Sequence, residues 1–187
     1  GVIRVLRLFR QLLLVLVAVS AVTAGAFAQA QAPVRDPENT LFLDTAYGRV
    51  VIALRPDLAP KHVARIKELT RQHFYDGLKF HRVIDGFMAQ TGDPKGNGTG
   101  GSGKELSAEF TREPFVRGTV GMARAQSPNS GDSQFFIMFD RGDYLNGLYT
   151  VWGRVISGME FVDKLKRGEP PRDPDVIVKM QVAADVK

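Results

Sequence analysis

The glycine-rich run at residues 96–105, GNGTGGSGKE, has the spacing of a loop that binds nucleotide phosphates, because Gly98 and Lys104 fit G-x-x-x-x-G-K. A phosphate loop follows a strand, opens a helix and carries Ser or Thr after the lysine to bind magnesium. Here Pro94 precedes the glycines and Glu105 stands where the Ser or Thr is needed. A carboxylate at that place repels phosphate, so the sequence favours a surface loop over a nucleotide site.

Candidates for metal binding and nucleophilic catalysis are few. The chain has no cysteine and three histidines, His62, His73 and His81, which excludes thiol nucleophiles and cysteine-based metal sites. His62 and His73 do not have a metal-binding spacing, and we expect His81 to be a hydrogen-bonded core residue. Ser133 is not part of a G-x-S-x-G turn, which argues against a hydrolase. We therefore predict no metal and no cofactor.

The first 28 residues have the features of an export signal. Three arginines precede an apolar run at 12–22, and small residues before and at Ala28 fit a cleavage site. An uncleaved membrane anchor and a buried helix are the alternatives. Polar residues interrupt the apolar run that an anchor would need, and the lack of an amphipathic pattern disfavours a buried helix. We predict a signal peptide at 1–28, a linker at 29–38 and one domain at 39–187. The mature protein is expected to be periplasmic or secreted, with no membrane contact after cleavage.

The net charge gives no support to nucleic-acid binding. The whole chain has 25 Lys and Arg against 20 Asp and Glu, but three arginines lie in the predicted signal, which leaves 22 against 20, a net charge of +2. A nucleic-acid-binding domain usually carries a strong basic excess. The absence of cysteine is compatible with an oxidising compartment and means that the core alone must hold the fold.

Eight short β-rich runs and two helices account for most of the remaining chain. The first helix, 59–72, has Val63 and Ile66 on one stripe, and the second covers 159–167. Because there is no βαβ rhythm, we predict a mainly β fold, a closed antiparallel eight-stranded β-barrel capped by two α-helices. The expected strands are bounded by Gly, Asp, Asn or Pro and lie at 40–45, 49–54, 79–84, 87–91, 115–122, 134–139, 151–155 and 176–183.

Three segments resemble the cyclophilin family of peptidyl-prolyl isomerases. They are FYDGLKFHRVIDGFMAQTGDPKGNGTGG at 74–101, GTVGMARAQSPNSGDSQFFIMF at 118–139 and YLNGLYTVWGRV at 144–155. The patterns F-H-R-x-I-x-G-F-M-x-Q and S-Q-F-F-I occur in order, and the resemblance runs from about Thr40 to the end of the chain. It implies that the glycine run is a surface loop at the edge of the substrate groove. It also implies an enzyme that isomerises X-Pro peptide bonds and assists the folding of exported proteins.

The resemblance identifies Arg82 as the catalytic residue. Its guanidinium is always charged and can act as a donor without proton transfer; a surface ion pair is the ordinary role for a lone arginine, but the surrounding motif favours catalysis. The resemblance further implies a set of substrate-binding residues, namely Phe87, Met88, Gln90, Ala123, Arg124, Gln134, Phe136, Tyr144, Leu145 and Tyr149.

Within this set the expected roles differ. Aromatic and aliphatic members form the walls of a proline pocket, and Gln90 orients Arg82 or binds the substrate backbone. Ala123 and Arg124 offer main-chain groups to the residues before proline. Because side chains alternate along a strand, Gln134 and Phe136 share a face that can meet a ligand, while the opposite face fills the barrel.

Three positions depart from the family pattern. Tyr144 stands where many members have tryptophan, which implies weak cyclosporin binding. Tyr149 takes a common histidine position, and its hydroxyl could make the same hydrogen bond. Arg124 replaces a frequent asparagine, but backbone contacts there should be retained. Trp152, the single tryptophan, is expected in the core.

A second hypothesis is a non-catalytic chaperone module that binds proline-containing segments on the same fold. It would use the same pocket, and the retention of Arg82 favours the enzyme. In either case we predict proline-containing polypeptides as partners, no nucleic acid, and a monomer.

Overall fold

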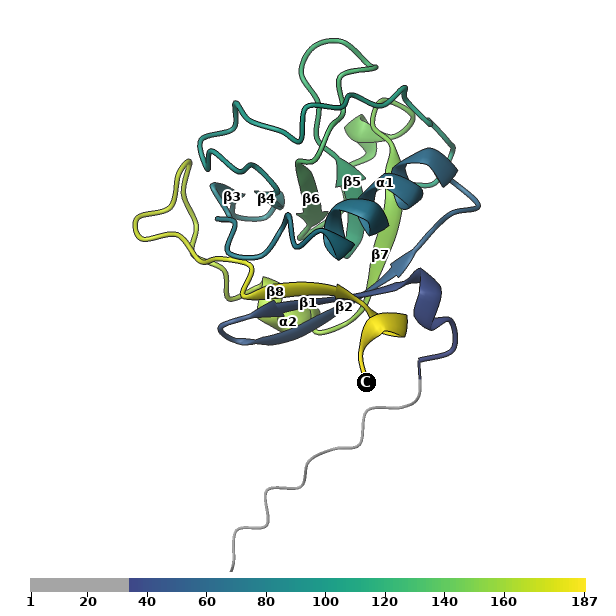
Figure 1. Ribbon diagram of the computed structural model, residues 1–187. Helices are drawn as coiled ribbons and strands as arrows, with labels where there is room; N and C mark the ends of the chain where they lie inside the picture. The colour runs from purple at the N-terminus through teal and green to yellow at the C-terminus, as the bar shows by residue number, and fades with distance from the viewer. Residues whose placement is uncertain (1–33) are drawn as a thin grey trace, which may run out of the picture. The chain divides into compact units, whose positions relative to one another are not determined.

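The computed structural model describes residues 34–187 (Figure 1). The predicted export signal and the first part of the predicted linker lie outside the described residues. The compact unit begins at Val34, whose side chain packs against a small cluster around Phe42. Next comes a 3-10 helix, η1 (Pro37–Asn39), whose Glu38 forms ion pairs with Lys67 and Arg71. The end of the predicted linker is therefore part of the domain.

The domain is built on one antiparallel sheet of eight strands in the order β3-β4-β6-β5-β7-β2-β1-β8. All eight predicted strands are present, several of them shorter than predicted because turns take up their ends. The strands are β1 (Thr40–Thr45), β2 (Gly48–Leu54), β3 (Arg82–Ile84), β4 (Met88–Thr91), β5 (Thr119–Met122), β6 (Phe135–Met138), β7 (Val151–Ser157) and β8 (Lys179–Val182).

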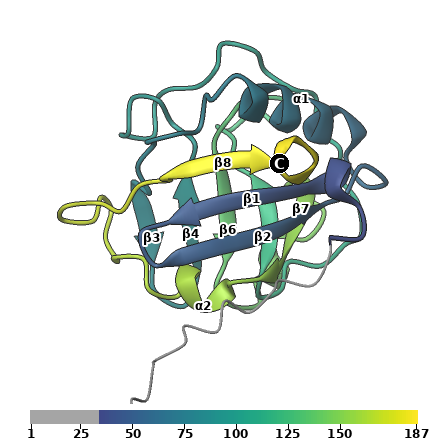
Figure 2. The same ribbon diagram turned by 60° about the horizontal axis from the view of Figure 1, so that its bottom comes forward.

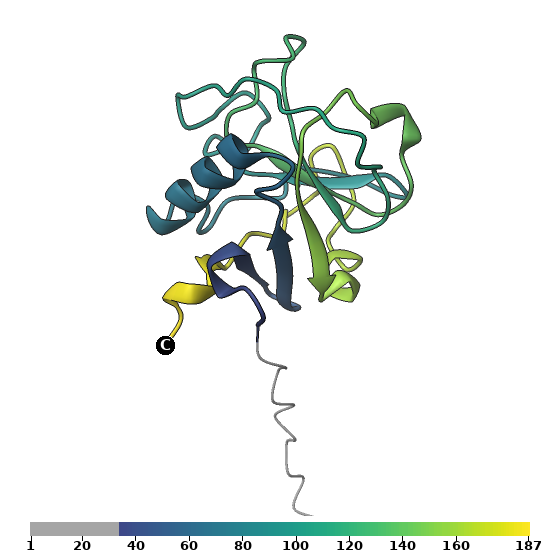
Figure 3. The same ribbon diagram turned by 90° about the vertical axis from the view of Figure 1, so that its right-hand side faces the viewer.

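The sheet curls round on itself but the predicted closed barrel is not formed (Figures 2 and 3). Within residues 34–187 no strand ladder joins the edge strands β3 and β8. The segments ahead of these strands meet at a single bridge between Lys79 and Val176. Ile177 donates to Leu78 and accepts from Gly77, but the next residue, Val178, donates to Asp44 on β1, so this contact does not continue into a ladder between the two edge strands.

The two predicted helices lie at opposite ends of the curled sheet (Figure 2). In α1 (Pro60–Arg71) the predicted apolar stripe, including Val63 and Ile66, is buried. The second helix is shorter than the predicted 159–167, because α2 (Met159–Val162) is followed by turns.

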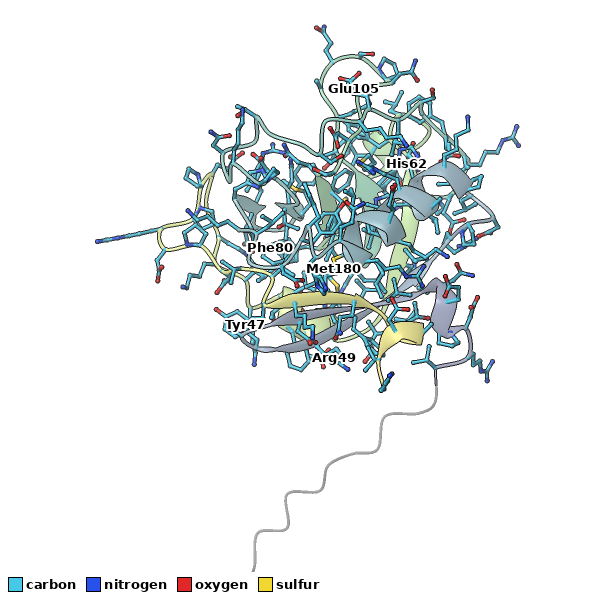
Figure 4. All side chains as sticks on the ribbon, in the orientation of Figure 1. Tyr47, Arg49, His62, Phe80, Glu105 and Met180 are labelled. Atoms are coloured by element: carbon cyan, nitrogen blue, oxygen red, sulfur yellow. The ribbon has the colours of Figure 1, made fainter. Side chains whose placement is uncertain are left out.

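Two apolar clusters pack on the two faces of β6. Phe135 and Ile137 belong to the main core inside the curl, whereas Phe136 and Met138 belong to a second cluster. The predicted alternation is thus confirmed, and Trp152 is fully buried as expected. Figure 4 shows Phe80 and Met180 among the interior side chains, and both are almost completely buried.

No helix in the described part of the chain is both long and apolar enough to cross a membrane.

Candidate active site

A pocket of about 500 Å³ opens where β3, β4 and β6 meet several loops. Strands supply Arg82, Met88, Gln90 and Phe136, and the loops after β5 and before β7 supply the opposite wall. The pocket gathers side chains separated by more than 60 positions in the sequence. The predicted residues that line it are Arg82, Phe87, Met88, Gln90, Ala123, Arg124, Phe136, Leu145 and Tyr149.

The floor of the pocket is apolar and well packed. Met88, Phe136 and Leu145 are buried members of the second cluster. The ring of Phe136 stacks on Phe115 at 5.7 Å between centroids and meets the ring of Tyr149 edge-on at 5.8 Å. A floor of this kind suits a compact apolar group such as a proline ring.

Arg82 stands at the rim, and its guanidinium is held on two sides. Its Nη1 lies 3.4 Å from the Oε1 of Gln90, which is its direct partner across the β3–β4 pair. Side chains directly opposite in an antiparallel pair lie on the same face. Its Nε donates to the Oε1 of Glu169 at 2.7 Å. The Arg82 side chain remains 42% exposed, so it is accessible to a ligand.

A chain of amide contacts continues from Gln90. Its Nε2 donates to the Oε1 of Gln134 at 2.9 Å, and the Nε2 of Gln134 donates to the carbonyl of Gly100 at 2.8 Å. Gln134 does not line the main pocket but lines a second pocket of about 300 Å³ beside it. The two pockets share Gln90 and Arg124 among their lining residues.

Ala123 and Arg124 line the pocket, but the backbone N–H of Ala123 and the guanidinium of Arg124 already make hydrogen bonds within the protein. The backbone N–H of Ala123 donates to the carbonyl of Gln134 at 2.9 Å. The guanidinium of Arg124 donates to carbonyls on both adjoining loops, including that of Leu148, and lies over the ring of Tyr149. The side chain of Arg124 therefore joins two loops of the pocket wall.

Tyr144 does not line the main pocket. Its ring packs on Phe87 at 5.8 Å between centroids, and the residue is 65% exposed. It lies in a short 3-10 helix, η2 (Asp143–Leu145), whose last residue does reach the pocket. Tyr144 thus forms an outer edge next to a wall residue.

The glycine run borders both pockets, and several of its backbone N–H groups are bound by the protein's own carboxylates. The buried Asp93 accepts backbone N–H groups of Lys95, Asn97 and Gly98 at 2.6–3.1 Å. Burial alone would raise the pKa of Asp93, but these donors outweigh it and hold that pKa below its usual value.

Asp132 holds the other end of the run through the backbone N–H groups of Ser102 and Gly103. A Cβ on Gly101 would come within 2.6 Å of Asp132, so close approach explains the glycine there. Glu105, labelled near the top of Figure 4, is exposed and lines the second pocket. A phosphate group bound by this loop would have to displace the carboxylates of Asp93 and Asp132. This geometry excludes a nucleotide-binding site at the glycine run.

Asn97 and Gly98 also line the pocket and belong to the glycine run that was expected at the groove's edge. Sequence reasoning missed three lining residues: His81, Glu169 and Pro170. The F-H-R motif could have pointed to His81, since it adjoins Arg82. Glu169 had no comparable local signal.

The expectation for His81 was only half right. The residue is buried, but neither ring nitrogen has a hydrogen-bond partner among residues 34–187. Burial lowers the pKa of His81, which favours the neutral ring. Among residues 34–187 no group of three or more His, Asp or Glu side chains is arranged to hold a metal ion.

Comparison with known proteins agrees with this geometry. Residues 40–182 match the family model described as cyclophilin type peptidyl-prolyl cis-trans isomerase/CLD. A probable peptidyl-prolyl cis-trans isomerase of Brucella suis is 55% identical, covering 90% of this chain and 97% of that protein.

Two crystal structures are also similar. A cyclophilin from Hirschia baltica superposes with a TM-score of 0.75 at 32% identity, covering 81% of this chain and 76% of the other. A cyclophilin type isomerase from Cryptosporidium parvum, solved in the presence of the dipeptide Ala-Pro, gives a TM-score of 0.71 at 30% identity, covering 76% and 98%. The chain therefore belongs to the cyclophilin-type peptidyl-prolyl cis-trans isomerases, enzymes that accelerate rotation about X-Pro peptide bonds.

Proposed function

We propose that the main pocket binds the proline ring of a substrate and that Arg82 is the catalytic donor. The observation that supports this proposal most directly is a permanent cation held at the rim of an apolar pocket. Arg82 is fixed by two side-chain contacts, while Met88, Phe136 and Leu145 form the floor beneath it.

The reaction needs no covalent step. Rotation about a peptide bond faces a barrier of about 18–20 kcal/mol, because nitrogen shares its lone pair with the carbonyl. In the half-rotated state that lone pair is localised on the prolyl nitrogen and can accept a hydrogen bond. A fixed guanidinium beside the imide therefore stabilises the rotated state more than either planar state, which is the condition for catalysis.

The flanking substrate backbone would be held by the polar wall. Of the proposed contacts, Gln90 already holds Arg82, while the Ala123 carbonyl accepts no hydrogen bond from residues 34–187. Gln134 links the main pocket to the glycine run. We therefore place the residue before proline between the Ala123 strand end and Gln90.

The test is to compare Arg82→Ala with the native protein in isomerisation and in peptide binding. We expect isomerisation of an Ala-Pro reporter peptide to fall by about 100-fold or more, as for loss of one preorganised donor, while the peptide Kd changes much less. Arg82→Lys keeps the charge but loses the planar fork, so it should recover only part of the rate.

Arg49→Ala is the matched control, because Arg49 is a half-buried arginine on β2 that pairs with Asp44 on β1 and does not line the pocket. Equal losses of rate and binding in Arg82→Ala would instead support the non-catalytic module that only holds proline segments.

We further propose that the clients are exported proteins folding in the periplasm or outside the cell. The support is the basic, apolar and small-residue order of the first 28 residues. Fractionation of cells expressing the protein, with mass measurement of the exported form, tests this. A mature chain that begins after Ala28 supports the proposal, and a chain confined to the cytoplasm contradicts it.

A further inference from the structure

Glu169 brings a carboxylate to the rim of the pocket from a distant part of the sequence. Its Oε1 lies 2.7 Å from the Nε of Arg82, and both Glu169 and Pro170 line the pocket. The two paired side chains are 42% and 55% exposed. An ion pair this exposed adds little to stability, so its place at the reacting centre points to another use.

The backbone around Glu169 is fixed independently of the ion pair. Gly168 exchanges two hydrogen bonds of 2.8 Å with Val83, the neighbour of Arg82. Its φ is +147°, and a Cβ would approach the Cα of Pro171 to 2.5 Å, so only glycine fits. Farther along, Asp175 accepts the backbone N–H of Lys166 at 2.8 Å. The carboxylate of Glu169 is therefore presented to Arg82 by a braced segment.

The contacts of the guanidinium differ from nitrogen to nitrogen. Nε donates to Glu169 and Nη1 donates to Gln90. Within the described residues Nη2 makes no hydrogen bond. A planar fork held at two nitrogens cannot turn freely about its long stem, which leaves Nη2 as the donor for a substrate.

We propose that Glu169 is a positioning residue, which acts with Gln90 to hold the Arg82 guanidinium so that Nη2 meets the prolyl imide. This inference rests on the proposed role of Arg82 as donor. Orientation matters most in the half-rotated state, where the hydrogen bond to nitrogen forms. Loss of Glu169 therefore reduces kcat more than it changes KM.

Glu169→Gln is the main test variant, because it keeps the size of the side chain and removes its charge. We expect kcat to fall by about 3-fold to 10-fold, the scale of one exposed ion pair plus freed arginine rotamers, with KM changing less than 2-fold by the same reasoning. Asp173→Asn is the matched control: Asp173 is in the same segment, does not line the pocket and, in the described part of the chain, pairs only with Lys166. That control should retain the native kcat.

A spectroscopic readout separates positioning from a merely structural role. The Nε–Hε signal of Arg82 in a ¹H–¹⁵N spectrum, assigned by its absence in Arg82→Lys, reports the contact with the carboxylate. In Glu169→Gln we expect this signal to shift and its hydrogen to exchange with solvent faster, while the urea unfolding midpoint stays unchanged.

Failure of this inference is distinguishable from failure of the proposed function. If Arg82→Ala retains the native rate, the donor role itself is wrong. If Arg82→Ala loses the rate but Glu169→Gln matches Asp173→Asn in kcat, only the positioning role is overturned. An unchanged Nε–Hε signal in Glu169→Gln overturns it as well.

Discussion

The guanidinium carbon of Arg124 lies 4.6 Å from the ring centre of Tyr149. The same guanidinium donates twice to the carbonyl of Leu148 and once each to the carbonyls of Ala125 and Gln126, at 2.9–3.1 Å. One planar side chain thus ties the loop after β5 to the loop before β7. Because Tyr149 in turn packs on Phe136, this clamp supports the wall of the proline pocket.

The clamp predicts a binding defect in Arg124→Ala. Without it Tyr149 and its loop gain freedom, so KM should rise by about 3-fold to 10-fold with a smaller change in kcat. Arg124→Lys should not restore KM, because an ammonium cannot serve carbonyls on two loops and stack on the ring together. Steady-state kinetics on a proline peptide measure both constants. Full recovery in the lysine variant would contradict the clamp.

Gly121 provides a steric test of the pocket floor. A Cβ at this position in β5 would lie 2.7 Å from ring atoms of both Phe115 and Phe136. We predict that Gly121→Ala displaces Phe136, lowers kcat/KM and reduces the free energy of unfolding by about 1–3 kcal/mol.

Gly153→Ala is the matched control for this prediction. A Cβ at Gly153 would crowd Ile52 at 2.9 Å in the main core. It should therefore reduce stability similarly while leaving kcat/KM close to the native value. Urea denaturation and kinetics on both variants decide the matter; parallel losses of activity in the two would mean that the effect is not local to Phe136.

Tyr144→Trp tests the expectation of weak cyclosporin binding. The resemblance associates this position with the drug, and here the tyrosine lies at the outer edge beside Phe87. A larger indole adds contact area and an N–H donor, so we predict a cyclosporin Kd lower by about 10-fold, or about 1.4 kcal/mol. Ile156→Trp, at another exposed apolar position on β7, controls for an added surface tryptophan. Calorimetric titration measures both Kd values. Equal cyclosporin Kd values for Tyr144→Trp and the native protein would contradict the prediction that Tyr144 weakens cyclosporin binding.

Much of the fold could be predicted because it depends on local patterns. Eight strands, two helices and the two faces of the 134–139 run follow from alternation and turn residues. The length of the second helix does not. Its helical pattern continues past Val162, but Lys164 and Leu165 donate to the carbonyls three residues back instead of four. Asp175 then takes the backbone N–H of Lys166, so turns replace the predicted last part of the helix.

The candidate site shows the same difference between features set by local sequence patterns and features set by contacts between distant residues. Residues within the recognisable motifs, such as Arg82 and Phe136, were found from the sequence and meet in the pocket. Glu169 was missed because it reaches Arg82 across 87 positions, in a segment whose path depends on pairing between Gly168 and Val83. Whether the sheet closes also depends on the contacts of a few residues next to its edge strands, and the periodicity of the sequence does not predict these contacts.

Glu109 holds the start of α1 from a distant loop, and this predicts a stability defect in Glu109→Ala. The residue before the helix, Ala59, has no capping side chain; instead the carboxylate of Glu109 accepts the backbone N–H groups of Lys61 and His62 at 2.9 and 3.0 Å. Loss of this cap, together with a buried His62 nitrogen left without a partner, should cost about 2–4 kcal/mol.

Glu113→Ala is the control in the same loop, since within the described residues the side chain of Glu113 makes only a long ion pair of 3.5 Å with Arg55. Its free energy of unfolding should stay within about 0.5 kcal/mol of the native value. A comparable loss in both variants would show that the loop, and not the cap, carries the effect.

Two buried histidines predict that acid weakens the fold well above the range in which carboxylates titrate. Burial lowers the pKa of His62, although Glu109 beside its ring partly offsets this, and burial also lowers the pKa of His81. In the unfolded chain both rings have the ordinary pKa of about 6.5. Just below that pH the unfolded state therefore binds more protons than the folded state. The free energy of unfolding keeps the full contribution of the two neutral histidines above about pH 6.5, and it decreases as the pH falls toward the folded pKa values. The slope can approach about 1.4 kcal/mol per pH unit for each histidine.

Urea denaturation at pH 7.5 and 5.5 measures this loss of stability. The loss should largely disappear in a variant carrying His62→Gln and His81→Gln, because glutamine stays neutral at both pH values. If the double variant loses as much stability as the native protein, the titrating groups lie elsewhere.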